Sequence, residues 1–158
     1  MHTRFLTALL LSPILGLSIN AASPSLAQRA TGAESEAAIA SPEQCSQIIA
    51  AANQAVQNVQ TVTQNNPSGD AESLLLIADV ADQAIATMQL IDLSDTQLQG
   101  YRDRFVTMYN STSQASRNLV AAVRARNEAD AQTAYEMIVQ ATADEGPLVE
   151  AVNGYCGS

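Results

Sequence analysis

The sequence contains no lysine, and His2 is its only histidine. All seven basic residues are arginine, and sixteen aspartates and glutamates give a formal net charge of −9. Nucleic-acid binding depends on a basic surface that neutralises phosphates, so this balance argues against a nucleic-acid partner. The same repulsion disfavours an anionic membrane surface. We therefore expect an acidic protein that binds neither.

The first 27 residues have the pattern of a secretory signal peptide. Met1–Arg4 carries a positive charge, Phe5–Leu17 is apolar, and Ser25–Ala27 offers the small residues that precede a cleavage point. The apolar run is short of the ~20 residues needed to cross a membrane, which weakens the alternative of an uncleaved anchor. Cleavage after residues 1–27 predicts an exported protein, periplasmic or extracellular, with no remaining membrane span.

Loss of the signal peptide would remove His2 and leave no histidine. A b-type haem with a histidine ligand, a Cys-x-x-Cys-His haem attachment, Glu-x-x-His di-iron sites and histidine-dependent hydrolytic triads all require that residue. Met88, Met108 and Met137 could ligate a soft metal, but methionine at helical spacing is typical of core filler. We therefore predict no metal, no cofactor and no enzymatic activity.

Residues 28–40 contain almost no large apolar side chain, so they are predicted to be a disordered leader. The rest of the chain, 41–157, suits a single domain. Apolar residues three and four apart indicate helices at 41–64, 70–91 and 95–126, and a fourth helix that follows a tight turn at 127–130. The inward face of the third helix is predicted to be Leu98, Tyr101, Phe105, Met108, Thr112, Ala115, Leu119 and Ala122.

Short connections between these helices predict an all-α, up-down-up-down antiparallel four-helix bundle. Gly146-Pro147 interrupts the fourth helix and predicts a kink there. Ser41 with Gln44, and Ser94 with Gln97, have the spacing of capping boxes at the starts of the first and third helices.

Cys45 and Cys156 are the only cysteines, and an even pair in an exported chain is typical of a disulfide. Cys45 lies in the first turn of the first predicted helix and Cys156 at the close of the fourth. The bundle topology brings these two places to the same end. We therefore predict an intramolecular Cys45–Cys156 bond.

Charged residues offer few candidate sites. The carboxylate pairs Asp79 with Asp82 and Asp144 with Glu145 could serve acid–base chemistry, but on so acidic a chain they are more typical of a solvated face. Glu145 falls at an inward position beside the predicted break, where a carboxylate could cap free amides. The five arginines of the helical region lie on the third helix, where a tight hairpin predicts two pairings, Arg104 beside Asp82 and Arg117 near Asp70.

Two functions remain open. Leu76, Val80 and Leu90 lie off the inward face of the second helix and could form an apolar strip that binds an unknown envelope protein, unless neighbouring helices cover them. Such a protein would act by protein–protein interaction or in a structural role. Alternatively, the alanine- and threonine-rich seam around Thr112, Ala115 and Ala122 could enclose a cavity and carry a small molecule, although close helix packing also explains it.

The tail from Glu145 to Cys156, EGPLVEAVNGYC, together with YRDRFVTMY at Tyr101–Tyr109, resembles small exported cyanobacterial helical-bundle proteins of uncharacterised function. The resemblance covers the bundle and implies no activity. It implies the cyanobacterial envelope as a setting, and it draws attention to Glu145, Asn153 and Tyr155.

Overall fold

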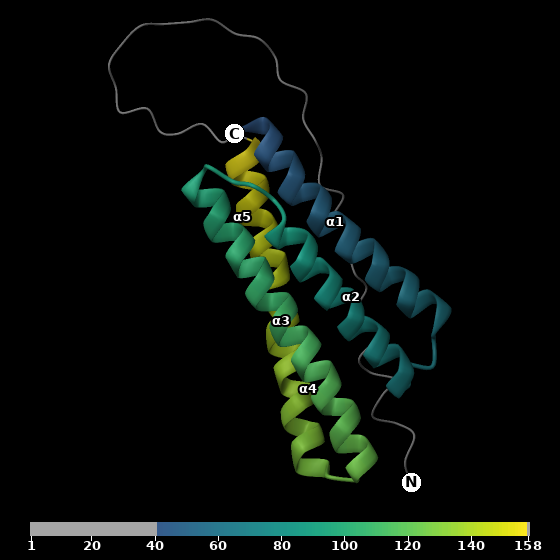
Figure 1. The fold of residues 1–158 in the computed structure, drawn as a ribbon. Coiled ribbons are helices and arrows are strands. Elements are labelled where there is room, and N and C mark those ends of the chain that lie inside the picture. Colours follow the sequence, from purple (N-terminus) through teal and green to yellow (C-terminus); the bar gives the residue numbers. More distant parts are fainter. Residues whose placement is uncertain (1–40, 158) are drawn as a thin grey trace, which may run out of the picture.

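The computed structural model describes residues 41–157, which form helices packed against one another (Figure 1). This confirms the predicted all-α fold. The predicted signal peptide at 1–27 and the leader at 28–40 lie outside the described residues. The helices are α1 (Pro42–Asn65), α2 (Ala71–Gln89), α3 (Thr96–Ala125), α4 (Glu128–Ala143) and α5 (Glu145–Gly157).

Helix α3 is central, because it packs against α1, α2, α4 and α5. Its predicted inward face is buried at every position except Thr112, which is half-buried. The Thr112 hydroxyl donates to the carbonyl of Met108 at 3.0 Å, so its polar group is satisfied within the helix. The spacing of apolar residues therefore predicted the buried side of α3 correctly.

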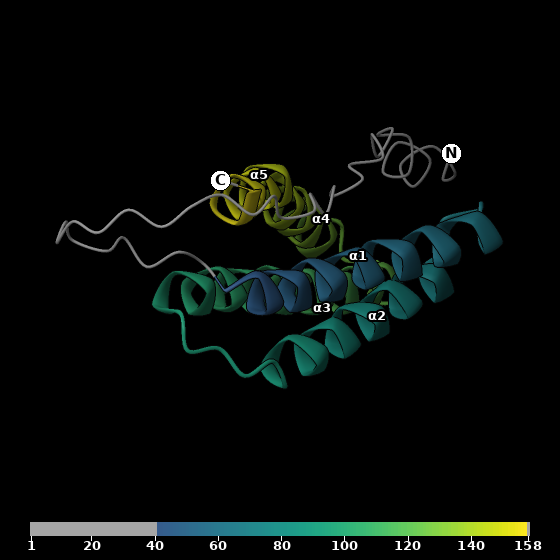
Figure 2. The ribbon, with the colours of Figure 1, turned by 90° about the horizontal axis from the view of Figure 1, so that it is seen from above.

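The other helices pack on different sides of α3. Figure 2 shows α4 and α5 on the opposite side of α3 from α2. Within residues 41–157, no Cα atom of α4 lies within 8 Å of one in α1 or α2, whereas α5 packs against both α1 and α3. One end of the molecule is thus closed by α5. Toward the other end, α4 contacts α3 but neither α1 nor α2.

The break between α4 and α5 lies at Asp144, earlier than the predicted Gly146-Pro147. Proline lacks an N–H and its ring clashes with the carbonyl four residues before it. For Pro147 that carbonyl belongs to Ala143, the last residue of α4. Pro147 itself lies in the first turn of α5, where proline is tolerated.

The connection between α2 and α3 differs from the predicted tight hairpin. Residues 90–95 separate the two helices, and Leu93 within them is buried in the core. Because this segment lengthens the connection, the register of α3 against α2 is shifted. Arg117 consequently pairs with Asp79 at 2.8 Å and Asp82 at 2.6 Å, so both predicted pairings, Arg104 with Asp82 and Arg117 with Asp70, are wrong.

Three helices start with a side-chain cap. Asp70 accepts from the amide of Ser73, and Asp95 accepts from the amides of Gln97 and Leu98. Asn127 accepts from the amide of Asp130. The predicted Ser94 cap is wrong by one residue, and Ser41 precedes α1 without a side-chain cap bond.

Two clusters of buried residues form the core. The larger contains residues from α1, α2, α3 and α5, and its biggest side chains include Ile48, Met88, Leu98, Phe105 and Leu148. The smaller lies where α3 meets α4 and the start of α2. It consists of Leu74, Ala115, Leu119, Val120, Ala134 and Ile138.

The turn between α3 and α4 is the tip of the molecule in Figure 1. Arg126 adopts a left-handed conformation with φ 56°. Its amide donates to the carbonyl of Val123, and the amide of Asn127 donates to that of Ala122, which is the Schellman arrangement that ends a helix. Residues 123–130 are all exposed.

Candidate functional site

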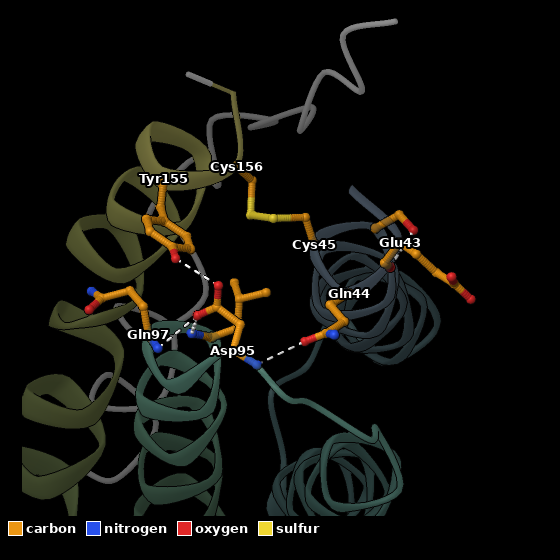
Figure 3. Close-up of a disulfide and its surroundings, with 9 residues drawn as sticks. Glu43, Gln44, Cys45, Asp95, Gln97, Tyr155 and Cys156 are labelled. Carbon is orange, nitrogen blue, oxygen red and sulfur yellow. Dashed lines mark hydrogen bonds between the residues drawn. A yellow bond between two sulfur atoms is a disulfide. The ribbon is translucent and has the colours of Figure 1, made fainter. Parts of the chain in front are cut away.

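The predicted disulfide is present. Cys45 in the first turn of α1 and Cys156 in the last turn of α5 are joined by a 2.09 Å S–S bond, with their Cα atoms 5.7 Å apart (Figure 3). The bond connects residues separated by 111 positions in the chain. It closes the end of the molecule at which α1 begins and α5 ends.

Hydrogen bonds beside the disulfide link α1 and α5 to the 90–95 segment. The Gln44 side chain donates to the Ser94 hydroxyl at 2.8 Å and accepts from the amides of Ser94 and Asp95 at 3.0 and 3.2 Å. The Tyr155 hydroxyl donates to Asp95 at 2.8 Å. Figure 3 shows Gln44, Asp95 and Tyr155 converging beside the sulfur atoms from three separate elements.

Asp95 is central to this arrangement, because one of its carboxylate oxygens caps α3 and the other accepts from Tyr155. These bonds, first that from the Leu98 amide and then that from Tyr155, hold the pKa of Asp95 below its usual value. The same bond raises the pKa of Tyr155. The Tyr155 ring also meets Tyr101 edge to face, with the ring centroids 5.9 Å apart. Asp95 and Tyr155 therefore form a structural anchor between α3 and α5.

Two further polar residues, Glu145 at the start of α5 and Tyr109 on α3, influence each other electrostatically. Glu145 is half-buried, and burial raises the pKa of its carboxyl. Burial also raises the pKa of Tyr109 on α3, and the Glu145 charge adds to that effect. Tyr109 is only 8% exposed, and within residues 41–157 its hydroxyl has no hydrogen-bond partner. The Ser116 hydroxyl, one heptad along α3, is likewise buried and unpaired among the described residues.

The predicted apolar strip on α2 is exposed in part. Leu90 is 86% exposed and Leu76 38%, whereas Val80 is half-buried. Val123 on α3 and Met137 and Val139 on α4 are the other large apolar side chains exposed in the described chain. The alternative in which neighbouring helices cover Leu76 and Leu90 does not hold for residues 41–157.

The other sequence candidates are dispersed. Asp79 and Asp82 are occupied by Arg117, while Asp144 is exposed and Asn153 half-buried on α5. Met88 and Met108 are buried in the core, but Met137 is 39% exposed. The residues from 41 to 157 include no group of three histidine, cysteine or acidic side chains close enough to hold a metal ion. None of the helices described here is long and apolar enough to cross a membrane.

No family model, curated protein or solved structure matches this chain. The arrangement of its own residues is therefore the basis for a functional proposal. Sequence reasoning missed Gln44, Ser94 and Asp95 as a linked group, because their local spacing resembles two independent capping boxes. It also missed Tyr109, which is buried although it lies outside the predicted inward face of α3.

Proposed function

We propose that this chain is a non-catalytic, exported protein that acts in the cell envelope by binding another protein. The observation that carries this proposal is the exposure of Leu76 on α2 and of Leu90 directly after it. Large apolar side chains gathered on a surface typically mark an interaction site. The apolar strip, Leu76, Val80 and Leu90, is the surface that we assign to the partner.

The chemistry of the polar residues supports a non-catalytic role. Asp95 and Tyr155 hold helices together, and Arg117 occupies Asp79 and Asp82. The cysteines are joined to each other. These groups stabilise the fold, and each has a partner within it.

The architecture that we infer is an up-down-up-down bundle in which α4 and α5 together form a kinked fourth helix. The short separation at Asp144 and the packing of both helices on α3 support this reading. The resemblance of the 145–156 and 101–109 segments to exported cyanobacterial proteins supports an envelope setting. The sequence of residues 1–27 supports export by a cleaved signal peptide.

A periplasmic carrier of small molecules is the second candidate, and one observation favours it. The Tyr109 and Ser116 hydroxyls are buried on one face of α3 without a partner among the described residues. Buried polar groups are normally satisfied, so two such hydroxyls would suit a small polar ligand. Ala115 and Ala122, also on α3, are buried as well.

Photo-crosslinking in the native envelope tests the interaction. A photoreactive residue at Leu90 should give one discrete protein adduct, and the same residue at Val139, which is also exposed but lies on α4, should not. Equal labelling from both positions, or from neither, would contradict the proposal. Native mass spectrometry of the purified protein distinguishes the carrier, which would retain a small molecule lost on Tyr109→Phe substitution.

A further inference from the structure

The exposed residues of α2 belong to a regular row. Leu76, Val80, Gln83, Thr87 and Leu90 follow one another at spacings of four, three, four and three residues, and Leu90 is the residue that directly follows α2 with helical backbone angles. Val80 is half-buried and the others are exposed. This alternation is the seam spacing of a coiled coil, and here it occurs on the outer side of a helix whose inner side is already packed.

The two polar members do not prevent close packing. The Thr87 hydroxyl donates to the carbonyl of Gln83 at 2.9 Å, so its hydrogen-bonding demand is met within α2. A polar residue at a seam position is also a common way to fix the register of paired helices. The row spans about 21 Å at ~1.5 Å per residue, enough for two heptads of a second helix.

The elements on this side of the molecule contribute acidic residues and no basic ones. The described part of the chain has its arginines on α3 or directly after it, and of these Arg117 reaches across to Asp79 and Asp82 of α2. Glu72, Asp79 and Asp92 lie on α2 or directly after it and are exposed. Glu72 and Asp79 occupy positions that flank the row on one side, where interhelical ion pairs form in coiled coils.

We propose that the outer row of α2, namely Leu76, Val80, Gln83, Thr87 and Leu90, binds a basic amphipathic helix of a partner protein. The partner's apolar residues pack along the row. Its lysines or arginines face Glu72 and also Asp79, whose side chain is held by Arg117 but remains 64% exposed. A second copy of this chain would bring like charges together, so charge complementarity favours a cationic partner. This inference rests on the proposed function, since it names the class of protein that the strip binds.

A designed helical peptide provides the test. The probe has leucine at its seam positions and lysine at its flanking positions, and a matched peptide has glutamate in place of lysine. Fluorescence anisotropy with the full chain should show binding of the lysine peptide that weakens with added salt, and much weaker binding of the glutamate peptide. Leu76→Ser combined with Leu90→Ser should weaken binding at least about tenfold, because exposed leucines supply the contact area.

The matched control is Val139→Ser, which removes another exposed apolar side chain, on α4, and should leave affinity unchanged. Glu72→Gln should reduce the salt dependence while the seam contacts persist. Circular dichroism of each variant establishes that it is folded, which is expected because the substituted side chains are exposed.

Three results would overturn the inference: no binding of the lysine peptide at millimolar concentration, equal binding of the two peptides, or self-association of the chain that Leu90→Ser abolishes. The last result would identify a second copy as the occupant. Any of them can occur together with a discrete adduct at Leu90 in the native envelope, which would preserve the proposed interaction function. Absence of that adduct counts against the function itself.

Discussion

The two ends of this molecule are stabilised in different ways. At the closed end, a disulfide, the Gln44 bonds and the Asp95–Tyr155 bond join α1, α3, α5 and the 90–95 segment. At the tip, only α3 and α4 meet, and the polar bonds are local caps such as that of Asn127. The same helix, α3, runs through both ends, so the number of helices around it determines the difference.

The core reflects this contrast. Phe105 and Leu98 are almost fully buried near the closed end, whereas the cluster toward the tip is smaller and contains no aromatic side chain. Regions with few buried apolar contacts open most easily. We therefore expect a gradient of local stability along α3, and the following predictions test it.

The largest effect is expected from removing the disulfide. The Cys45→Ser, Cys156→Ser double variant should lose about 3 to 5 kcal/mol, because the bond restricts a long loop in the unfolded chain. Urea denaturation measures the loss, and hydrogen exchange should accelerate most in α5 and at the start of α1. If exchange increased mainly at the α3–α4 tip, the closed end would not depend on the bond.

Core truncations compare the ends directly. Leu98→Ala at the closed end should cost more than Leu119→Ala toward the tip, within the ~2 to 5 kcal/mol usual for such changes. The reason is that the surroundings of Leu98 are held by covalent and polar links and cannot collapse into the cavity. Equal losses in urea denaturation would show that the tip is packed as rigidly as the closed end.

Glu145, near the boundary of the two regions, should make stability depend on pH. Its folded pKa is raised, so its contribution is fully present below the unfolded value near 4.5 and is lost as pH rises through the folded pKa. Glu145→Gln should therefore stabilise the protein increasingly as pH rises, by about 1.4 kcal/mol per unit of pKa difference.

The exposed carboxyl of Glu150, also on α5, provides the control. Urea denaturation of Glu150→Gln over the same pH range, from acidic to neutral, is the baseline against which the effect of Glu145→Gln is compared. The comparison with wild type also cancels the opposite slope from Asp70, Asp82 and Asp95, whose pKa values are lowered. A pH-independent effect of Glu145→Gln would mean that its carboxylate is solvated.

The smallest effects are expected at the tip. Asn127→Ala removes the cap of α4 and should cost about 1 kcal/mol. Arg126→Gly should instead stabilise the turn by roughly 0.5 to 1 kcal/mol, since glycine adopts the left-handed conformation without strain. Hydrogen exchange in residues 124–131 should be the fastest of the helical body in wild type and should change in opposite directions in the two variants. Protection equal to that of Ile48 would contradict the gradient.

Much of the fold could be predicted because its signals are local. The inward face of α3 follows from spacing, and the position of Cys45 and Cys156 at opposite ends of the helical region, with short connections between helices, placed the disulfide. The starts and ends of most helices were also predicted within a few residues. The apolar strip was predicted from the same spacing. Leu76 and Leu90 are exposed and Val80 is half-buried, while the binding of a partner there stays a prediction.

Contacts between distant residues could not be predicted in the same way. Gln44 bonds to Ser94 and Asp95 because burial of Leu93 places the 90–95 segment against the core. No local sequence pattern predicts the course of that segment. The shifted register of Arg117 has the same cause. The effect of the Glu145 charge on Tyr109 depends on the break at Asp144, which Pro147 produces through a carbonyl four residues earlier.

The Cys45–Cys156 bond also changes the connectivity of the chain. Residues 45–156 form a closed covalent ring, and the exposed arginines at its far side, Arg124 and Arg126, lie where trypsin has access. A single cut there opens the ring but releases nothing, because both fragments stay attached through sulfur. Proteolytic cleavage at the tip therefore leaves the two fragments as one covalently joined molecule, until a reductant breaks the disulfide and separates them.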